Sequence, residues 1–257
     1  MASQIQYIVD EGTGIARVTL DRPERRNALN RALVEELKDS LVLAESDERV
    51  RVIVIAGSGP DFCAGADLRE LQEAVEAGPD ASLAEARALG DLFILIRKLE
   101  KPVVALVHGQ ALAGGAGLAT ACDLVLAQSD ARLGYPEVRL GFVPAMVMAI
   151  LRRSVGEKRA FELIALGNSI DADTAYRFGL LNRVFEAESF DQEAGAFLET
   201  LASRSASAVA LSKRLLYQIE GASFEAAIHE GAEVNVIARE TDDCREGVRR
   251  FLERADR

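Results

Sequence analysis

A strand-like apolar run that ends in a glycine-rich segment constrains this chain most. Residues 103–107 read Val-Val-Ala-Leu-Val, and residues 109–117 read Gly-Gln-Ala-Leu-Ala-Gly-Gly-Ala-Gly. A buried strand that turns through small residues into a helix leaves the first N–H groups of that helix without partners, and the helix dipole adds positive potential there. The segment therefore predicts a strand–turn–helix corner that can hold an anion or a developing oxyanion.

A second segment of the same kind lies upstream. The strand-like run 52–56 leads through Gly57-Ser58-Gly59 to Phe62-Cys63-Ala64-Gly65-Ala66-Asp67-Leu68. Two such corners can each give one N–H to a single carbonyl oxygen, which stabilises an enolate without a metal. Close packing of a helix on a sheet explains either segment alone equally well, and residues 115–120 begin like a dinucleotide fingerprint that lacks its third glycine. The prediction of an oxyanion site therefore rests on the pair.

Composition narrows the class of protein. The chain has 257 residues, of which 49% are hydrophobic, and a net charge of −11, which disfavours nucleic acid or an anionic membrane as partner. Cys63, Cys122 and Cys244 are too few for a disulfide framework and show no zinc-ligand spacing, so we expect free thiols and no metal site. The N-terminus lacks the pattern of a signal peptide, and the nearly apolar run 111–127 contains Asp123, so we expect a cytoplasmic protein without a membrane span.

The pattern of apolar residues changes about two thirds along the chain. The first part alternates strands and helices and predicts a mixed α/β core, whereas the chain after residue 157 is helical almost throughout. The polar stretch 74–82, which contains Gly78-Pro79, is the expected mobile loop. The expected strands are 5–9, 15–20, 52–56, 103–107, 124–127 and 181–185; the expected helices are 30–44, 81–99, 157–166, 172–178, 192–203, 206–219, 224–239 and 243–253.

Three further motifs join the two glycine-containing segments, residues 62–68 and 109–123. They are Asp21-Arg22-Pro23-Glu24-Arg25-Arg26-Asn27-Ala28-Leu29-Asn30, Leu133-Gly134-Tyr135-Pro136-Glu137-Val138-Arg139-Leu140-Gly141 and the ending Glu240-Thr241-Asp242-Asp243-Cys244-Arg245-Glu246-Gly247. Together these motifs resemble those of the enoyl-CoA hydratase/isomerase (crotonase) superfamily, in the order and spacing of that family. The resemblance covers essentially the whole chain.

The resemblance implies an α/β fold in which a spiral of ββα units, residues 1–195, precedes a helical oligomerisation region, residues 196–257. It implies a homotrimer or a dimer of trimers that binds acyl-CoA thioesters and needs no cofactor besides the coenzyme A of the substrate. The oxyanion donors of the family fall on the N–H groups of Ala66 and Gly114. The residues that match its CoA and substrate contacts are Arg25, Ala28, Ala64, Ala66, Asp67, Leu68 and Gly114.

Hydratases of this family use two glutamates, and this chain matches only the second, Glu137, because Gly117 occupies the first position. Losing one positioned acid or base costs about 100- to 10,000-fold in rate, which disfavours a standard hydratase. Moving a double bond from the β,γ to the α,β position needs only one base, which removes a proton at C2 and returns it at C4. We therefore expect a 3-enoyl-CoA to 2-enoyl-CoA isomerase with Glu137 as sole acid/base. The alternatives are a hydratase or decarboxylase with another second group, and a CoA-binding protein without catalysis.

Neighbouring residues refine this expectation. Apolar residues around Glu137 predict that burial raises its pKa. The bulky run 142–151 is expected to shape the acyl pocket. His108 and Tyr135 are expected to be structural, and Asp67 to cap or position a helix rather than transfer protons.

Overall fold

The computed structural model describes residues 3–255, and its main sheet has six strands in the order β1–β2–β3–β4–β6–β9. Within this sheet the β1–β2 hairpin is antiparallel, and the other strand pairs are parallel. Strands buried on both faces read as continuous apolar runs, as in Val-Ile-Val-Ile-Ala of β3. The six strands are β1 (Ile5–Asp10), β2 (Ile15–Leu20), β3 (Val52–Gly57), β4 (Val103–Val107), β6 (Leu124–Gln128) and β9 (Arg183–Phe185).

A second, three-stranded sheet contains β5 (Gln110–Leu112), β7 (Arg132–Gly134) and β8 (Ser169–Asp171). The chain alternates between the sheets, because β4 is followed by β5, β6 by β7, and β8 by β9. Each of these pairs of consecutive strands therefore adds one strand to the large sheet and one to the small sheet. The expected α/β architecture of repeated ββα units is confirmed.

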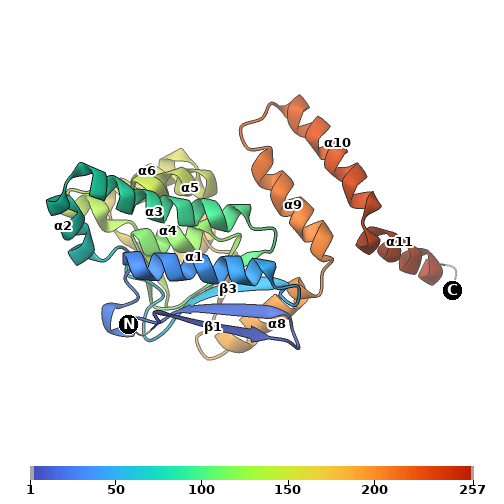
Figure 1. Cartoon of the computed structure of the whole chain (residues 1–257), viewed down its shortest axis with the longest axis horizontal. Coiled ribbons are helices and arrows are strands. Elements are labelled where there is room, and N and C mark those ends of the chain that lie inside the picture. The colour runs from blue at the N-terminus through green and yellow to red at the C-terminus, as the bar shows by residue number, and fades with distance from the viewer. Residues whose placement is uncertain (1–2, 256–257) are drawn as a thin grey trace.

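Helices cover both faces of the large sheet (Figure 1). On one face lie α1 (Arg31–Ser46), α3 (Pro79–Lys98) and α4 (Gly114–Ala121), and α8 (Phe190–Ala202) covers the other. Alternate residues of β3 divide between these faces, with Ile53 and Ile55 in the larger cluster and Val52 and Val54 beneath α8. The expected helix start is confirmed, because the Asn30 side chain accepts a hydrogen bond from the Leu33 N–H at 2.8 Å.

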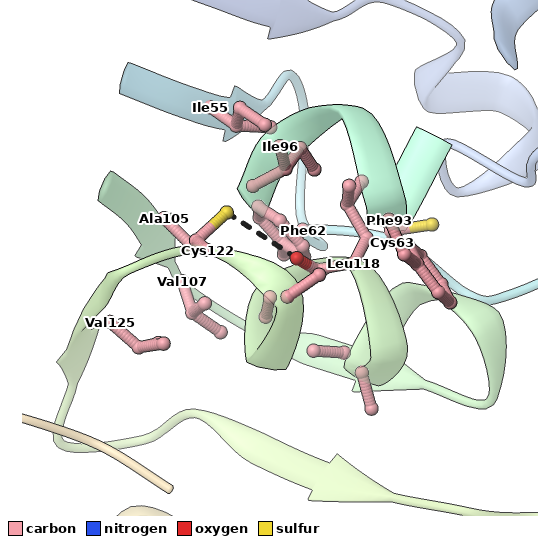
Figure 2. Packing of buried hydrophobic residues seen from close by; sticks show 14 of the residues in the cluster. Ile55, Phe62, Cys63, Phe93, Ile96, Ala105, Val107, Leu118, Cys122 and Val125 are labelled. Carbon is pink, nitrogen blue, oxygen red and sulfur yellow. Dashed lines mark hydrogen bonds between the residues drawn. The ribbon is translucent and has the colours of Figure 1, made fainter. Parts of the chain in front are cut away.

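The larger cluster packs α4 between the sheet and α3, as Figure 2 shows. Leu118 lies at its centre, with Phe62 and Phe93 close by. The Cys122 Sγ donates to the Leu118 carbonyl at 3.4 Å, and burial raises the pKa of Cys122 and that of Cys63, the latter to about 12. Both thiols are free and buried, as expected from the sequence, and they are packing groups here.

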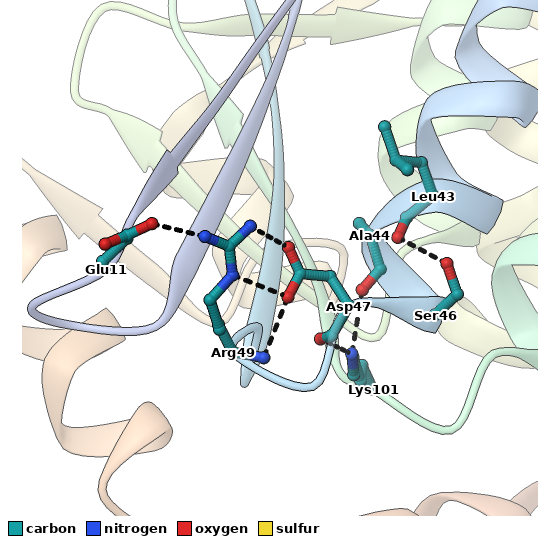
Figure 3. Close-up of polar contacts among 7 residues, drawn as sticks. All are labelled: Glu11, Leu43, Ala44, Ser46, Asp47, Arg49 and Lys101. Atoms are coloured by element: carbon teal, nitrogen blue, oxygen red, sulfur yellow. Dashed lines mark hydrogen bonds and ion pairs between the residues drawn. The ribbon is translucent and has the colours of Figure 1, made fainter.

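A polar cluster joins the β1–β2 hairpin to the end of α1 (Figure 3). The Arg49 guanidinium donates to Glu11 of the hairpin and to Asp47 after α1. The Lys101 Nζ donates to the Ala44 and Asp47 carbonyls at 2.8 and 2.6 Å, which satisfies acceptors that the last helical turn leaves free. The hydrogen bond from Arg49 lowers the pKa of Asp47 to about 2.

The remaining helices connect the spiral to a C-terminal arm, α9 to α11, that extends away from the sheets (Figure 1). A buried ion pair anchors the arm, since the Lys213 Nζ lies 2.8 Å from Asp123 Oδ2 and Tyr217 donates to Asp123 Oδ1. The predicted boundary after residue 195 falls within α8 and stays a prediction. These helices are α2 (Leu68–Ala77), α5 (Ala145–Val155), α6 (Glu157–Leu166), α7 (Ala172–Phe178), α9 (Ala206–Gln218), α10 (Phe224–Glu240) and α11 (Asp242–Ala255), with 3₁₀ turns η1 (Pro23–Arg25) and η2 (Pro136–Leu140).

The prediction of a loop over residues 74–82 is wrong. Helix α2 ends at Ala77 and α3 begins at Pro79, so Gly78 alone separates them. Gly78 has φ +108°, which glycine adopts readily, and proline is well suited to the first position of a helix. The same two residues that indicate a loop instead make a one-residue turn. No helix within residues 3–255 is both long and apolar enough to span a bilayer.

Candidate active site

The first predicted corner lies where β5 turns into α4. Ala113 has φ +50° and ψ −125°, an unusual backbone conformation that its N–H supports by donating to the Gly134 carbonyl at 2.8 Å. Gly114 is the first residue of α4, so its N–H has no acceptor inside the helix. That N–H donates to no other residue among those described.

The second corner lies against the first. The Leu29 N–H donates to the Gly65 carbonyl and the Asp67 N–H to the Leu29 carbonyl, which leaves the Ala66 N–H between them without an acceptor among residues 3–255. Gly65 has φ +103°, and a Cβ there would lie 2.8 Å from the Ala113 Cβ, so the close approach requires glycine. The Ala66 nitrogen is 3.8 Å from where a Cβ on Gly114 would lie. The two corners thus present adjacent free N–H groups.

A cavity of about 590 Å³ opens at these corners. Every residue predicted for catalysis or binding lines it, and most of the remaining lining residues are apolar, as expected for the run after residue 141. The predicted residues are Arg25, Ala28, Ala64, Ala66, Asp67, Leu68, Gly114 and Glu137; the others are Leu71, Glu85, Ala86, Leu89, Ala113, Pro136, Arg139, Leu140, Gly141, Phe142, Val143, Pro144, Ala145, Met146 and Val147.

Glu137 is the buried carboxyl of this cavity. It lies in the first turn of η2, follows Pro136 and is 8% exposed. Its Oε2 has no hydrogen-bond partner among the described residues, and burial raises the pKa of Glu137 above its ordinary value, with its own backbone N–H opposing the shift. The expected direction of this pKa shift is confirmed. A carboxyl with a free oxygen and a raised pKa can exchange a proton with a bound molecule near neutral pH.

Packing leaves no room for a carboxyl side chain at position 117 of α4. A Cβ on Gly117 would lie 2.5 Å from Val147 Cγ2 and 3.0 Å from Phe93 Cζ. Both neighbours are buried, and Val147 belongs to α5 in the bulky segment singled out from the sequence. Apolar side chains therefore occupy the space that a glutamate at position 117 would need.

Arginines hold the segment before α1 in different ways. Arg22 donates to the Ala28 carbonyl at 2.6 Å and to Asp67 at 3.1 Å, and Asp67 caps α2, as expected, by accepting from the Arg69 N–H. Arg26 is tied to Asp61 at 2.6 Å and does not line the cavity. Arg25 does line it, so the structure brings Arg25, but not its neighbour Arg26, to the site.

Two further candidates are structural, as expected. The His108 Nε2 lies 2.9 Å from the Gly59 carbonyl, outside the cavity lining. Tyr135 is fully buried with its hydroxyl 3.1 Å from Thr120 Oγ1, and burial raises its pKa.

Sequence reasoning missed Glu85 and Arg139 in the cavity lining. Glu85 lies on α3 four residues before the buried Leu89, on the same face of the helix. A charged residue on the apolar face of an amphipathic helix was the available signal. The sequence contains no comparable signal for Arg139.

Comparisons with known proteins agree with this geometry. The model of the family described as "Enoyl-CoA hydratase/isomerase" matches residues 10–257. A Thermus thermophilus protein that carries the provisional name enoyl-CoA hydratase is 41% identical over 93% of this chain and 95% of its own length. The crotonyl-CoA hydratase of Syntrophomonas wolfei is 35% identical, with 96% and 95% covered.

Solved structures give the same result. The crystal structure of an enoyl-CoA hydratase of Mycobacterium smegmatis superposes with a TM-score of 0.93 at 33% identity, covering 98% of this chain and 97% of that one. Together with two free N–H groups and a buried carboxyl in one cavity, these similarities identify the chain as an enzyme of the enoyl-CoA hydratase/isomerase family, which acts on acyl-CoA thioesters.

Proposed function

We propose that this enzyme converts 3-enoyl-CoA into 2-enoyl-CoA, with Glu137 as its acid/base. The observation that carries the proposal is that Glu137 is buried with an unpartnered oxygen, while Val147 and Phe93 occupy the space that a side chain at position 117 would need. An isomerase needs a single base that removes a proton at C2 and returns it at C4. A hydratase must also activate water.

In this mechanism the thioester oxygen accepts hydrogen bonds from the N–H groups of Ala66 and Gly114. Removal of the C2 proton by the Glu137 carboxylate sends the C–H electron pair toward the thioester, and negative charge develops on that oxygen. Two fixed backbone donors stabilise this dienolate without reorganising. Glu137 then returns the proton to C4, and the double bond lies between C2 and C3.

The other parts of the proposal concern binding and assembly. In this proposal Arg25 pairs with a phosphate of coenzyme A, and Ala28, Ala64, Asp67 and Leu68 contact the pantetheine part of coenzyme A. Their common place in the cavity lining supports both assignments. No cofactor beyond the coenzyme A of the substrate takes part. We place the enzyme in the cytoplasm as a homotrimer or a dimer of trimers. Its exposed apolar residues on the C-terminal arm, such as Phe224, Ile228, Val236 and Phe251, supply contact area.

A second candidate function, hydration, is favoured by the names of the relatives, among them the crotonyl-CoA hydratase of Syntrophomonas wolfei. The test follows the absorbance of the conjugated thioester with 3-hexenoyl-CoA, and runs crotonyl-CoA hydration in parallel. Conjugation without hydration supports the isomerase, and hydration at a comparable rate refutes it. Binding without either reaction points to decarboxylation or to a protein that only binds thioesters.

Glu137→Gln tests the base. We expect isomerisation to fall about 100- to 10,000-fold with the fold retained, because the amide keeps the shape but cannot take a proton. The matched control is Glu188→Gln, at an exposed position before α8. Unchanged turnover in Glu137→Gln would end the proposal.

A further inference from the structure

Glu85 is a third carboxyl of the reaction cavity, besides Glu137 and Asp67, and the proposed mechanism has no use for it. It lies on α3, lines the cavity of about 590 Å³ and makes no hydrogen bond or ion pair with another described side chain. Arg25 and Arg139 are the cations of the same lining, and Arg139 donates to Asn168 at 2.5 Å. Asp67 is neutralised by Arg22.

The packing of α3 on α4 places Glu85 relative to the thioester site. Leu89 lies 3.4 Å from the position of a Cβ on Gly114, and Phe93 lies 3.0 Å from that on Gly117, so the two helices run in the same direction. Glu85 is one helical turn, about 6 Å, before Leu89. It therefore lies beyond the N-terminal end of α4, on the side toward which the free Gly114 N–H points.

The walls leave an acyl chain a path past this residue. Toward Gly117 the site is closed by Val147 and Phe93. In the other direction, Ala66, Glu85 and Leu89 line both the reaction cavity and an adjoining cavity of about 450 Å³. An acyl chain that leaves the oxyanion site in that direction passes the Glu85 carboxyl.

The lining of the adjoining cavity is mainly negative, like the Glu85 carboxylate. Glu35, Glu70 and Glu73 line it with one cation, Arg31. Burial, followed by the charge of Glu70, raises the pKa of Glu85. A carboxylate brought to this place meets Glu85, Glu70 and Glu73 against the single cation of that lining, Arg31, so repulsion between like charges predominates.

We propose that Glu85 determines acyl-group specificity by excluding acyl chains with a terminal carboxylate and admitting neutral ones. This inference rests on the proposed function only in placing the thioester at Ala66 and Gly114. A six-carbon chain reaches about the length of one helical turn beyond its thioester carbon, which brings its terminal group near Glu85. The substrate class is therefore that of uncharged short and medium-chain enoyl-CoA thioesters.

The test compares two thioesters of equal length that do not react, hexanoyl-CoA and adipoyl-CoA, by calorimetric titration of the full-length protein. They differ only in the terminal carboxylate, so contacts to coenzyme A cancel. We expect wild-type protein to bind hexanoyl-CoA at least about tenfold more tightly. Glu85→Gln should reduce this preference several-fold by strengthening adipoyl-CoA binding, and Glu85→Lys should reduce it further.

Glu188→Gln is the matched control, because it changes the net charge equally at an exposed site outside both cavities. Equal affinity of wild-type protein for both thioesters, or the same preference in Glu85→Gln as in wild type, overturns the inference. Isomerisation of 3-hexenoyl-CoA, assayed on the same samples, reports on the proposed function separately. A protein that discriminates between the two ligands but does not isomerise refutes the reaction and leaves the specificity assignment standing.

Discussion

The contact between Gly117 and Val147 can be tested by adding one methyl group. In Gly117→Ala the new Cβ would lie 2.5 Å from Val147 Cγ2 and 3.0 Å from Phe93 Cζ, well inside van der Waals contact. Val147 is stiff about χ1 on a helix, and Phe93 is buried in the core, so neither side chain moves away freely. Overpacking of this kind costs about 1–3 kcal/mol.

Helix propensity acts in the opposite direction. Replacing glycine by alanine within a helix stabilises it by about 0.5–1 kcal/mol. We therefore expect Gly117→Ala to lower the free energy of unfolding by about 0.5–2 kcal/mol. Val147→Ala alone removes buried methyl groups and should cost about 2 kcal/mol. In the double variant the alanine methyl at 117 fills part of the vacated space, so the two costs should not add.

The assay is denaturant unfolding of the wild type, both single variants and the double variant. We expect a coupling free energy of about 1–2 kcal/mol that favours the double variant. A Gly117→Ala protein that is more stable than wild type, together with additive costs in the double variant, would show that the space above Gly117 is open. In that case the argument against a second carboxyl on α4 would fail.

Three further predictions use other groups. Burial raises the pKa of Glu137 in the folded state, so the contribution of Glu137 to stability falls as the pH rises above 4.5, the ordinary pKa of a glutamate. In thermal unfolding, Glu137→Gln should therefore be more stable than wild type at pH 8 and equal to it at pH 4. Lys213→Ala leaves Asp123 as a buried charge and should cost about 3–5 kcal/mol in urea unfolding, while Lys213→Met combined with Asp123→Asn should cost clearly less. Arg25→Ala should raise KM for 3-hexenoyl-CoA several-fold with kcat unchanged, and a loss confined to kcat would contradict its assignment to coenzyme A.

Much of the fold and the site could be predicted because both depend on short local patterns. The apolar runs of β3 and β4 and the helix expected from residue 30 appear in the sequence much as they do in the structure. The glycine segments predicted two corners with free N–H groups, and the structure brings Ala66 and Gly114 to one cavity. Backbone chemistry at strand ends is local, so the sequence shows it.

Features that depend on packing between distant segments could not be predicted. The sequence shows glycine at position 117 but not that Val147 fills the space beside it, since the two meet only when α5 docks on α4. Glu85 in the cavity wall likewise depends on how α3 lies along α4. The polar stretch around Gly78 led to the wrong prediction of a loop, because Gly and Pro occur both in loops and in a one-residue turn between two helices.

The two N–H groups at the corners belong to the main chain, so no substitution except one by proline deletes them. If these groups hold the thioester oxygen as proposed, a change in the carboxyls of the cavity leaves that site in place, provided that Gly65 and Ala113 keep their backbone conformations. In the proposed mechanism, thioester binding and reaction type therefore depend on different groups. A direct probe of the former is atomic rather than mutational: replacing the amide of Gly114 by an ester in a semisynthetic protein would remove one donor and leave every side chain as it is.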